Sequence, residues 1–134
     1  SEVAEADHGQ VFKVVKTGTT GNVSFKVANS PTSLKHWTTA GKLKFDLKVN
    51  SKAADATLLV KMDSGWPKLS DVSVTLPPVG EWGSFSIGVA DLMTRKNSLD
   101  PSGIANINSI TNIFVMEPSN SMDVVFDNIR FEVE

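Results

Sequence analysis

The chain has 134 residues, a length typical of one domain with a single hydrophobic core. Thirteen Lys and Arg residues against fifteen Asp and Glu residues leave a net charge of −2, which gives no positive field to hold a phosphate backbone, so nucleic acid is not an expected partner. The absence of cysteine excludes disulfides, zinc–thiolate sites and thiol catalysis.

Alternation of apolar and polar residues runs through most of the chain and predicts half-buried β-strands. In chain order, strands are predicted at residues 10–16, 23–27, 41–49, 58–62, 72–76, 85–87, 111–117 and 122–133. Residues 1–6 are expected to be a tether, 89–95 favour a short helix, and 98–110 favour a loop. No apolar run approaches the roughly 18 residues needed to cross a bilayer, so a membrane is not an expected partner.

Eight short strands separated by turn-forming residues predict an all-β fold. The turns are marked by the glycine and proline clusters at 17–21, 64–67 and 77–80. The prediction is a two-sheet antiparallel β-sandwich, either jelly-roll or immunoglobulin-like, that forms one domain over residues 1–134. Ser1 in place of an initiator Met predicts that this domain is a piece of a longer, processed protein.

Asp127 is the first candidate functional residue, because strict alternation in the last strand points it the same way as Val125, Ile129 and Phe131. A carboxylate facing a core costs several kcal/mol unless it is compensated. A calcium ion held by Asp127, a second acid and backbone carbonyls would compensate it. The alternatives are a β-bulge near Phe126 that rotates Asp127 to solvent, or a pairing with Arg130 or a backbone N–H.

Trp66 is the second candidate, because it lies in the predicted turn of residues 63–68, where a large ring is hard to bury. Its face could stack on a sugar ring, with Asp63 beside it and with Lys61 and Glu117 nearby if the strand order brings them together. The alternative is that Trp66 caps the sandwich or docks on a neighbouring domain. Trp37 is assigned equally to the core or to a ligand-binding face, and Trp82 to the edge of the core.

Catalysis by this domain alone is not expected. His8 and His36 are the only histidines, and the sequence contains neither a G-x-S-x-G nor an H-E-x-x-H motif. Two carboxylates about 5–9.5 Å apart would suffice for glycoside hydrolysis. Most of the acidic residues, however, alternate with apolar ones or lie in turns, as solvated surface charges do.

Three segments carry a resemblance to a known family. They are DHGQVFKVVKTGTTGNVSFKV at 7–27, GEWGSFSIGVADL at 80–92 and VVFDNIRFEVE at 124–134. Together they resemble the carbohydrate-binding jelly-roll modules, and in particular the C-terminal β-sandwich domain of some bacterial glycoside hydrolase family 3 exo-β-glucanases. The resemblance implies a galactose-binding-like jelly roll, a secreted or periplasmic location, and attachment to a β-glucan-degrading enzyme. It also implies a structural calcium, with Asp7 and a carbonyl near Gly21 as ligands beside Asp127.

Two functions follow as expectations. In the first, the domain is a non-catalytic accessory module of a secreted β-glucan-degrading glycoside hydrolase, and binds a β-glucan or its oligosaccharides weakly through Trp66, Trp37 and Asp63. In the second, it is a structural domain that packs on the catalytic domains of its parent chain and stabilises them, with Trp66 or Trp37 as anchor. The absence of tyrosine leaves fewer side chains that can stack on a sugar ring, which weighs against strong sugar binding.

Overall fold

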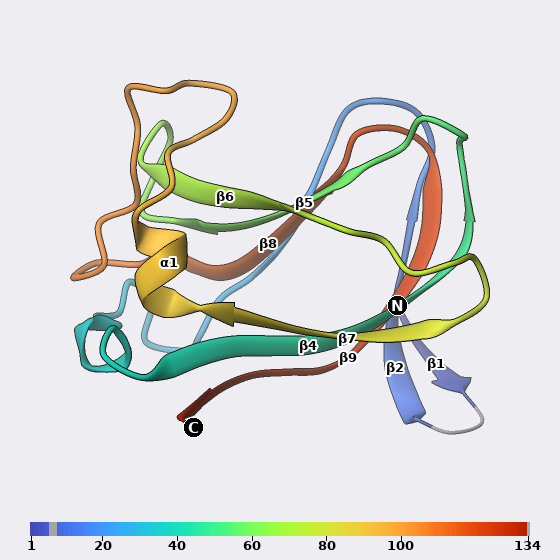
Figure 1. Cartoon of the computed structure of the whole chain (residues 1–134), viewed down its shortest axis with the longest axis horizontal. Coiled ribbons are helices and arrows are strands. Elements are labelled where there is room, and N and C mark those ends of the chain that lie inside the picture. The colour runs from blue at the N-terminus through green and yellow to red at the C-terminus, as the bar shows by residue number, and fades with distance from the viewer. Residues whose placement is uncertain (6–7, 134) are drawn as a thin grey trace.

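The computed structural model describes residues 1–5 and 8–133. All strand pairs in the described residues are antiparallel, and they form a five-stranded sheet of order β1-β2-β9-β4-β7 and a four-stranded sheet of order β3-β8-β5-β6. The strands are β1 (Glu2–Glu5), β2 (Gly9–Lys16), β3 (Val23–Phe25), β4 (Gly41–Lys52), β5 (Leu58–Asp63), β6 (Leu69–Val74), β7 (Trp82–Gly88), β8 (Asn112–Pro118) and β9 (Met122–Val133). Figure 1 shows the two sheets stacked as layers. The predicted antiparallel β-sandwich is confirmed.

Helical structure is minor, as predicted. It consists of the 3-10 turn η1 (Lys35–Trp37) and the helix α1 (Val89–Met93), which closes one end of the sandwich (Figure 1). Neither described helix has the length or the apolar character of a transmembrane segment. Residues 2–5 differ from the expectation of a tether, because they pair with β2 as strand β1.

An aromatic cluster joins the two layers. Phe114 of β8 lies at a ring-centroid distance of 5.3 Å from Phe45 of β4 and 5.9 Å from Phe126 of β9, and all three side chains are buried. Phe25 of β3 adds a further edge contact to Phe114 at 5.8 Å. Burying a side chain of this size stabilises the fold by roughly 1.5–3 kcal/mol. The cluster therefore fixes which face of each strand points inward.

A bulge in β9 changes the direction of Asp127. Lys44 pairs with Arg130 whereas Asp46 pairs with Asp127, so β9 carries an extra residue at this point, and Asn128 has a positive φ of 53°. Because Phe126 points into the core, Asp127 points outward, where its Oδ1 accepts the Asn128 backbone N–H at 2.9 Å. The prediction that Asp127 faces the core is wrong, and the alternative, a bulge near Phe126 that turns Asp127 outward, is what the structure shows.

The outer face of the five-stranded sheet is covered by paired charges. Lys48 contacts Glu5 at 2.6 Å, and the Lys48 ammonium also lies over the Trp82 ring. His8, just after β1, stacks on the same ring at a centroid distance of 3.8 Å. Trp82 thus lies on the outer face rather than at the predicted edge of the core, and its ring is covered by His8 and Lys48.

Asp46 is a carboxylate of this face whose ionised form is stabilised by its neighbours. Partial burial opposes its ionisation, while hydrogen bonds from Asn128 and Ser84 favour it. The charges of His8 and Arg130 act in the same direction as the hydrogen bonds. Together these contacts outweigh burial and hold the pKa of Asp46 below its usual range.

Asp46→Asn is therefore expected to lower the free energy of unfolding more at neutral pH than in acid. A lowered folded-state pKa means that the carboxylate contributes its stabilisation above the unfolded-state pKa and loses it as the pH falls through the folded-state value. Urea unfolding of both proteins at pH 7 and at about pH 2.5 measures the difference. Asp55→Asn, at an exposed loop carboxylate, is the control and should change little at either pH. Equal losses for Asp46→Asn at both values would contradict the assignment.

Candidate functional site

The outer face of the four-stranded sheet is hollowed into a groove of about 220 Å³. Its polar floor is formed by Lys61, Asp63, Asn112 and Glu117, and its apolar rim includes Trp66 and Leu99. β5 supplies Lys61 and Asp63 because the alternating residues Val60 and Met62 are buried in the core. The adjacent strand β8 supplies Glu117, so the strand order does bring the sequence-predicted residues together.

A second bulge brings Asn112 onto this face. Lys61 pairs with Val115 whereas Asp63 pairs with Asn112, so β8 carries one extra residue here. The Asn112 amide nitrogen donates to Asp63 Oδ2 at 2.7 Å. Its Oδ1 is shielded from solvent and accepts no hydrogen bond from any described residue. An unpaired buried acceptor costs about 1–3 kcal/mol, so Asn112 contributes to the groove through its bond to Asp63 and not through Oδ1.

Asp63 also shapes the turn that presents Trp66. Its Oδ1 accepts the backbone N–H of Gly65 at 3.1 Å, and Gly65 has a φ of 107°, a region that favours glycine. The next residue, Trp66, is 63% exposed. An exposed indole face beside hydrogen-bonding groups suits a ligand with apolar and polar sides, such as a sugar ring.

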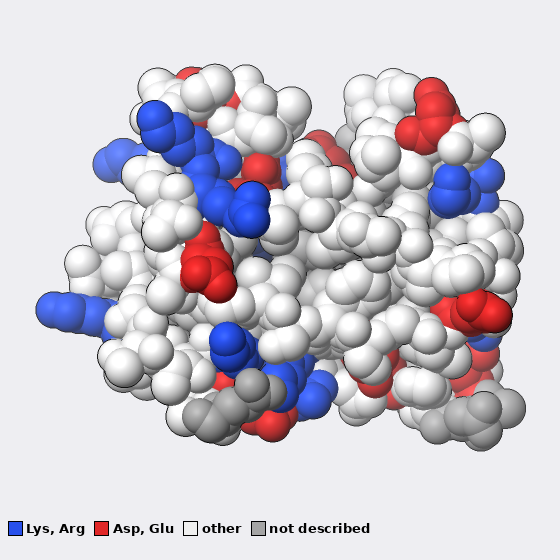
Figure 2. Space-filling view, in the orientation of Figure 1, with Lys and Arg blue, Asp and Glu red and all other residues white. Residues whose placement is uncertain are grey.

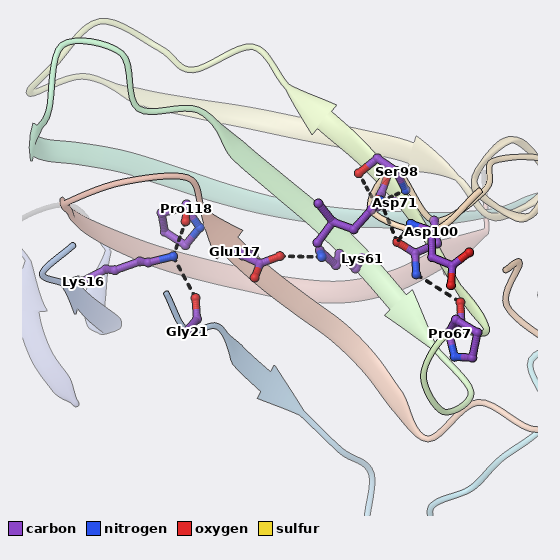
Figure 3. Close-up of polar contacts among 11 residues, drawn as sticks. Lys16, Gly21, Lys61, Pro67, Asp71, Ser98, Asp100, Glu117 and Pro118 are labelled. Carbon is purple, nitrogen blue, oxygen red and sulfur yellow. Dashed lines mark hydrogen bonds and ion pairs between the residues drawn. The ribbon is translucent and has the colours of Figure 1, made fainter. Parts of the chain in front are cut away.

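The floor of the groove carries one buried cation. Lys61 is only 3% exposed, and its Nζ lies 2.5 Å from Glu117 Oε2 (Figure 3). An ammonium has three donors, and a carboxylate accepts at both oxygens, so the pair can both donate to and accept from ligand hydroxyls. The groove combines an apolar platform with fixed polar partners.

Leu99 and Asn112 are two of the groove residues that sequence reasoning missed; the others are Asn22, Ser24, Leu69 and Val115. Leu99 belongs to the loop between α1 and β8, and is a single apolar residue in the otherwise polar run 96–102, apart from Pro101. That pattern was the available signal for Leu99. Asn112 had none, because regular alternation places it with the buried Phe114.

Trp37 does not join the groove. Its ring packs against Phe131 at a centroid distance of 5.8 Å and borders the buried core. Trp37 also lies directly against the start of β4, where a Cβ on Gly41 would fall 2.8 Å from the Trp37 Cβ. Of the three residues predicted to contact carbohydrate, Trp66 and Asp63 line the groove and Trp37 supports the sandwich.

The described residues predicted to share a calcium ion do not converge. Asp7 lies outside the described residues. The Gly21 carbonyl accepts a hydrogen bond from Lys16 Nζ at 2.9 Å, and the same ammonium contacts the Pro118 carbonyl (Figure 3). Lys16 pairs with Met122, five residues and about 16 Å along β9 from Asp127.

A buried ammonium and a divalent ion would repel each other at the Gly21 carbonyl, so this carbonyl does not fit the predicted metal site. The described residues also contain no group of three His, Cys, Asp or Glu side chains suited to a metal. Calcium binding itself stays a prediction, because Asp7 lies outside the described residues.

Charge on the molecular surface is mixed. Figure 2 shows acidic and basic side chains interspersed on one face, with no large patch of a single sign. This distribution agrees with the near-balanced composition and offers no extended basic surface on that face.

The fold and groove define the class of jelly-roll β-sandwiches to which carbohydrate-binding modules belong. Among solved structures, the chain is similar to the family 30 module of a cellulosomal cellulase of Clostridium thermocellum, with 19% identity, a TM-score of 0.66, and coverage of 97% of this chain and 78% of that one. It is also similar to the family 11 module of another cellulosomal cellulase of Clostridium thermocellum, with 20% identity, a TM-score of 0.66, and coverage of 100% and 80%.

A third similar structure is an exo-β-agarase, with 13% identity and a TM-score of 0.66, where all of this chain matches 22% of that one. These likenesses confirm the predicted jelly-roll fold. The sequence matches no protein-family model and no curated protein.

Replacing Lys16 tests the role of its ammonium. Lys16→Met keeps the aliphatic stem but leaves two carbonyls without their donor, so the free energy of unfolding should fall by about 1–3 kcal/mol. Lys13→Met, on the same strand, removes an ion pair to Asp123 of 3.5 Å on the outer face and should cost less than about 1 kcal/mol. Urea midpoints of the three proteins give the comparison, and a Lys16→Met midpoint equal to that of the wild type would show that the Lys16 contacts contribute nothing.

Proposed function

We propose that the groove binds carbohydrate and that the chain acts as a non-catalytic accessory module. The observation that carries the proposal is the exposed ring of Trp66 beside a floor of fixed hydrogen-bonding groups. The other outer face lacks this combination among its described residues, because its one tryptophan is covered by His8. The likeness of the fold to carbohydrate-binding modules supports the same reading.

The ligand that we propose is a neutral β-glucan or one of its oligosaccharides. Two carboxylates, Asp63 and Glu117, face one ammonium, Lys61, in the groove, so an anionic polysaccharide would meet net repulsion. A hydroxyl-rich neutral chain instead supplies donors for these carboxylate acceptors. The groove lies on the surface with Trp66 and Leu99 exposed, so we expect weak binding.

We further propose that the module is attached to a secreted bacterial β-glucan-degrading glycoside hydrolase related to the family 3 exo-β-glucanases. The resemblance of segments 7–27, 80–92 and 124–134 to that family supports this kinship. Two of the similar solved structures are described as modules of cellulases, and in the exo-β-agarase the matching region is a small part of a longer chain. The hydrolytic chemistry would then belong to the parent chain.

Trp66→Ala tests the proposed site. Removing the ring should weaken binding of mixed-linkage β-glucan oligosaccharides about tenfold, since an aromatic contact contributes on the order of 1–1.5 kcal/mol. The unfolding midpoint should hardly change, because Trp66 is exposed. Isothermal titration calorimetry with laminarin-type and mixed-linkage ligands measures both affinity and choice of ligand.

Val79→Ala is the matched control, since Val79 is also exposed but lies in the loop after β6, away from the groove. It should bind like the wild type. Absence of any binding by the wild-type domain at millimolar glucan would refute the proposal. That result would favour docking of Trp66 on catalytic domains of the parent chain, which deletion of the module would reveal as a lower melting temperature of the parent.

A further inference from the structure

The groove continues beyond Trp66 into a second hollow of about 200 Å³. Thr57 and Ser119 lie in this second hollow, whereas Trp66 lies only in the first. Leu99 and Glu117 line both hollows, so the two adjoin at these residues. The outer face of the four-stranded sheet therefore holds one extended groove with two compartments.

Leu99 is the apolar residue at the junction. It is 62% exposed, almost as much as Trp66. A single exposed leucine is ordinary on a protein surface, but this one overlies a polar floor between two hollows. A leucine side chain offers apolar area without a flat ring, which suits contact with the C–H edge of a sugar.

The loop that carries Leu99 is held by buried polar groups. Asn97 is fully buried, and its Oδ1 accepts the backbone N–H groups of Leu99 at 2.9 Å and of Asp100 at 3.2 Å. The Ser98 backbone N–H and hydroxyl both donate to Asp71 Oδ2, at 2.9 and 2.7 Å. Leu99 is thus fixed before any ligand arrives, which lowers the entropy lost on binding.

The same network reaches the turn that presents Trp66. The Asn97 amide nitrogen donates to the carbonyl of Pro67 at 3.1 Å, and Pro67 directly follows Trp66. Gly103 packs so closely on this turn that a Cβ there would fall 1.8 Å from the Pro67 carbonyl oxygen. One buried amide therefore holds both apolar contacts in a fixed relation.

We propose that Leu99 is a specificity-determining residue through which the groove selects a chain of linked sugars over a single sugar or a short oligosaccharide. Trp66 takes one ring in the first hollow, and Leu99 contacts the unit that passes into the second. Glu117, bonded to Lys61, accepts hydroxyls between them. This inference rests on the proposed carbohydrate-binding function and assigns the length of chain that the site requires.

The experiment compares a disaccharide with a hexasaccharide of the same mixed-linkage β-glucan by calorimetric titration. Leu99→Ala should weaken hexasaccharide binding about fivefold and disaccharide binding much less, because Leu99 borders the first hollow but only the longer ligand passes across it into the second. Trp66→Ala should weaken both. Leu99→Trp, which adds a stacking face at the same place, should tighten hexasaccharide binding only.

Ile104→Ala is the matched control, since Ile104 is exposed on the same loop but lines neither hollow. It should bind both ligands like the wild type. If Leu99→Ala affects neither ligand, or both equally, while Trp66→Ala still weakens binding, the role of Leu99 is refuted and the proposed function stands. If the wild type binds neither ligand, both are refuted.

Discussion

The position of Phe114 is the constraint on which the groove depends. Its ring meets Phe45 and Phe126 of the opposite sheet, so its direction is set by the contact between the two layers. With Phe114 turned inward, Glu117 three residues later along β8 turns outward. The pairing of β8 with β5 then sets Glu117 against the outward-facing Lys61. The polar floor of the groove follows from the packing of the core.

The strands and the two-sheet architecture could be predicted from the sequence because alternation is a local property, visible in runs such as 41–49. The exposed turn of Trp66 was visible in the same way. A bulge is different, because it arises from the pairing of two strands and leaves no mark in the alternation of either one. The bulge in β9 turned Asp127 away from the core, an outcome that the sequence offered only as an alternative, and the bulge in β8 brought Asn112 onto the groove, where nothing in the sequence predicted it.

The two outer faces use similar residue types for different ends. On the five-stranded sheet, lysines find acids across the strands or from the first hairpin, as Lys13 does with Asp123 and Lys48 with Glu5, and the tryptophan ring is stacked. On this face the charged groups are paired with one another and the indole ring is covered, so neither is available to a ligand. On the four-stranded sheet the lysine is buried beneath the surface and the tryptophan is open. Residue type alone does not distinguish the faces; the surroundings of each indole ring do.

Two loops that border the groove, the one with Leu99 and the one with Thr19 and Asn22, are each fixed by a buried polar side chain. Asn97 Oδ1 accepts the backbone N–H of Leu99 and so fixes the first of these loops. On the opposite side, Lys16 binds the carbonyl of Gly21 in the loop that supplies Thr19 and Asn22 to the two hollows, and also contacts the carbonyl of Pro118 at the end of β8. Neither residue lines the groove, yet each fixes backbone that does. A lysine that shares the inward face of its strand with Val14 thus serves the groove through contacts to the carbonyl of Gly21, five residues away, and to that of Pro118, 102 residues away.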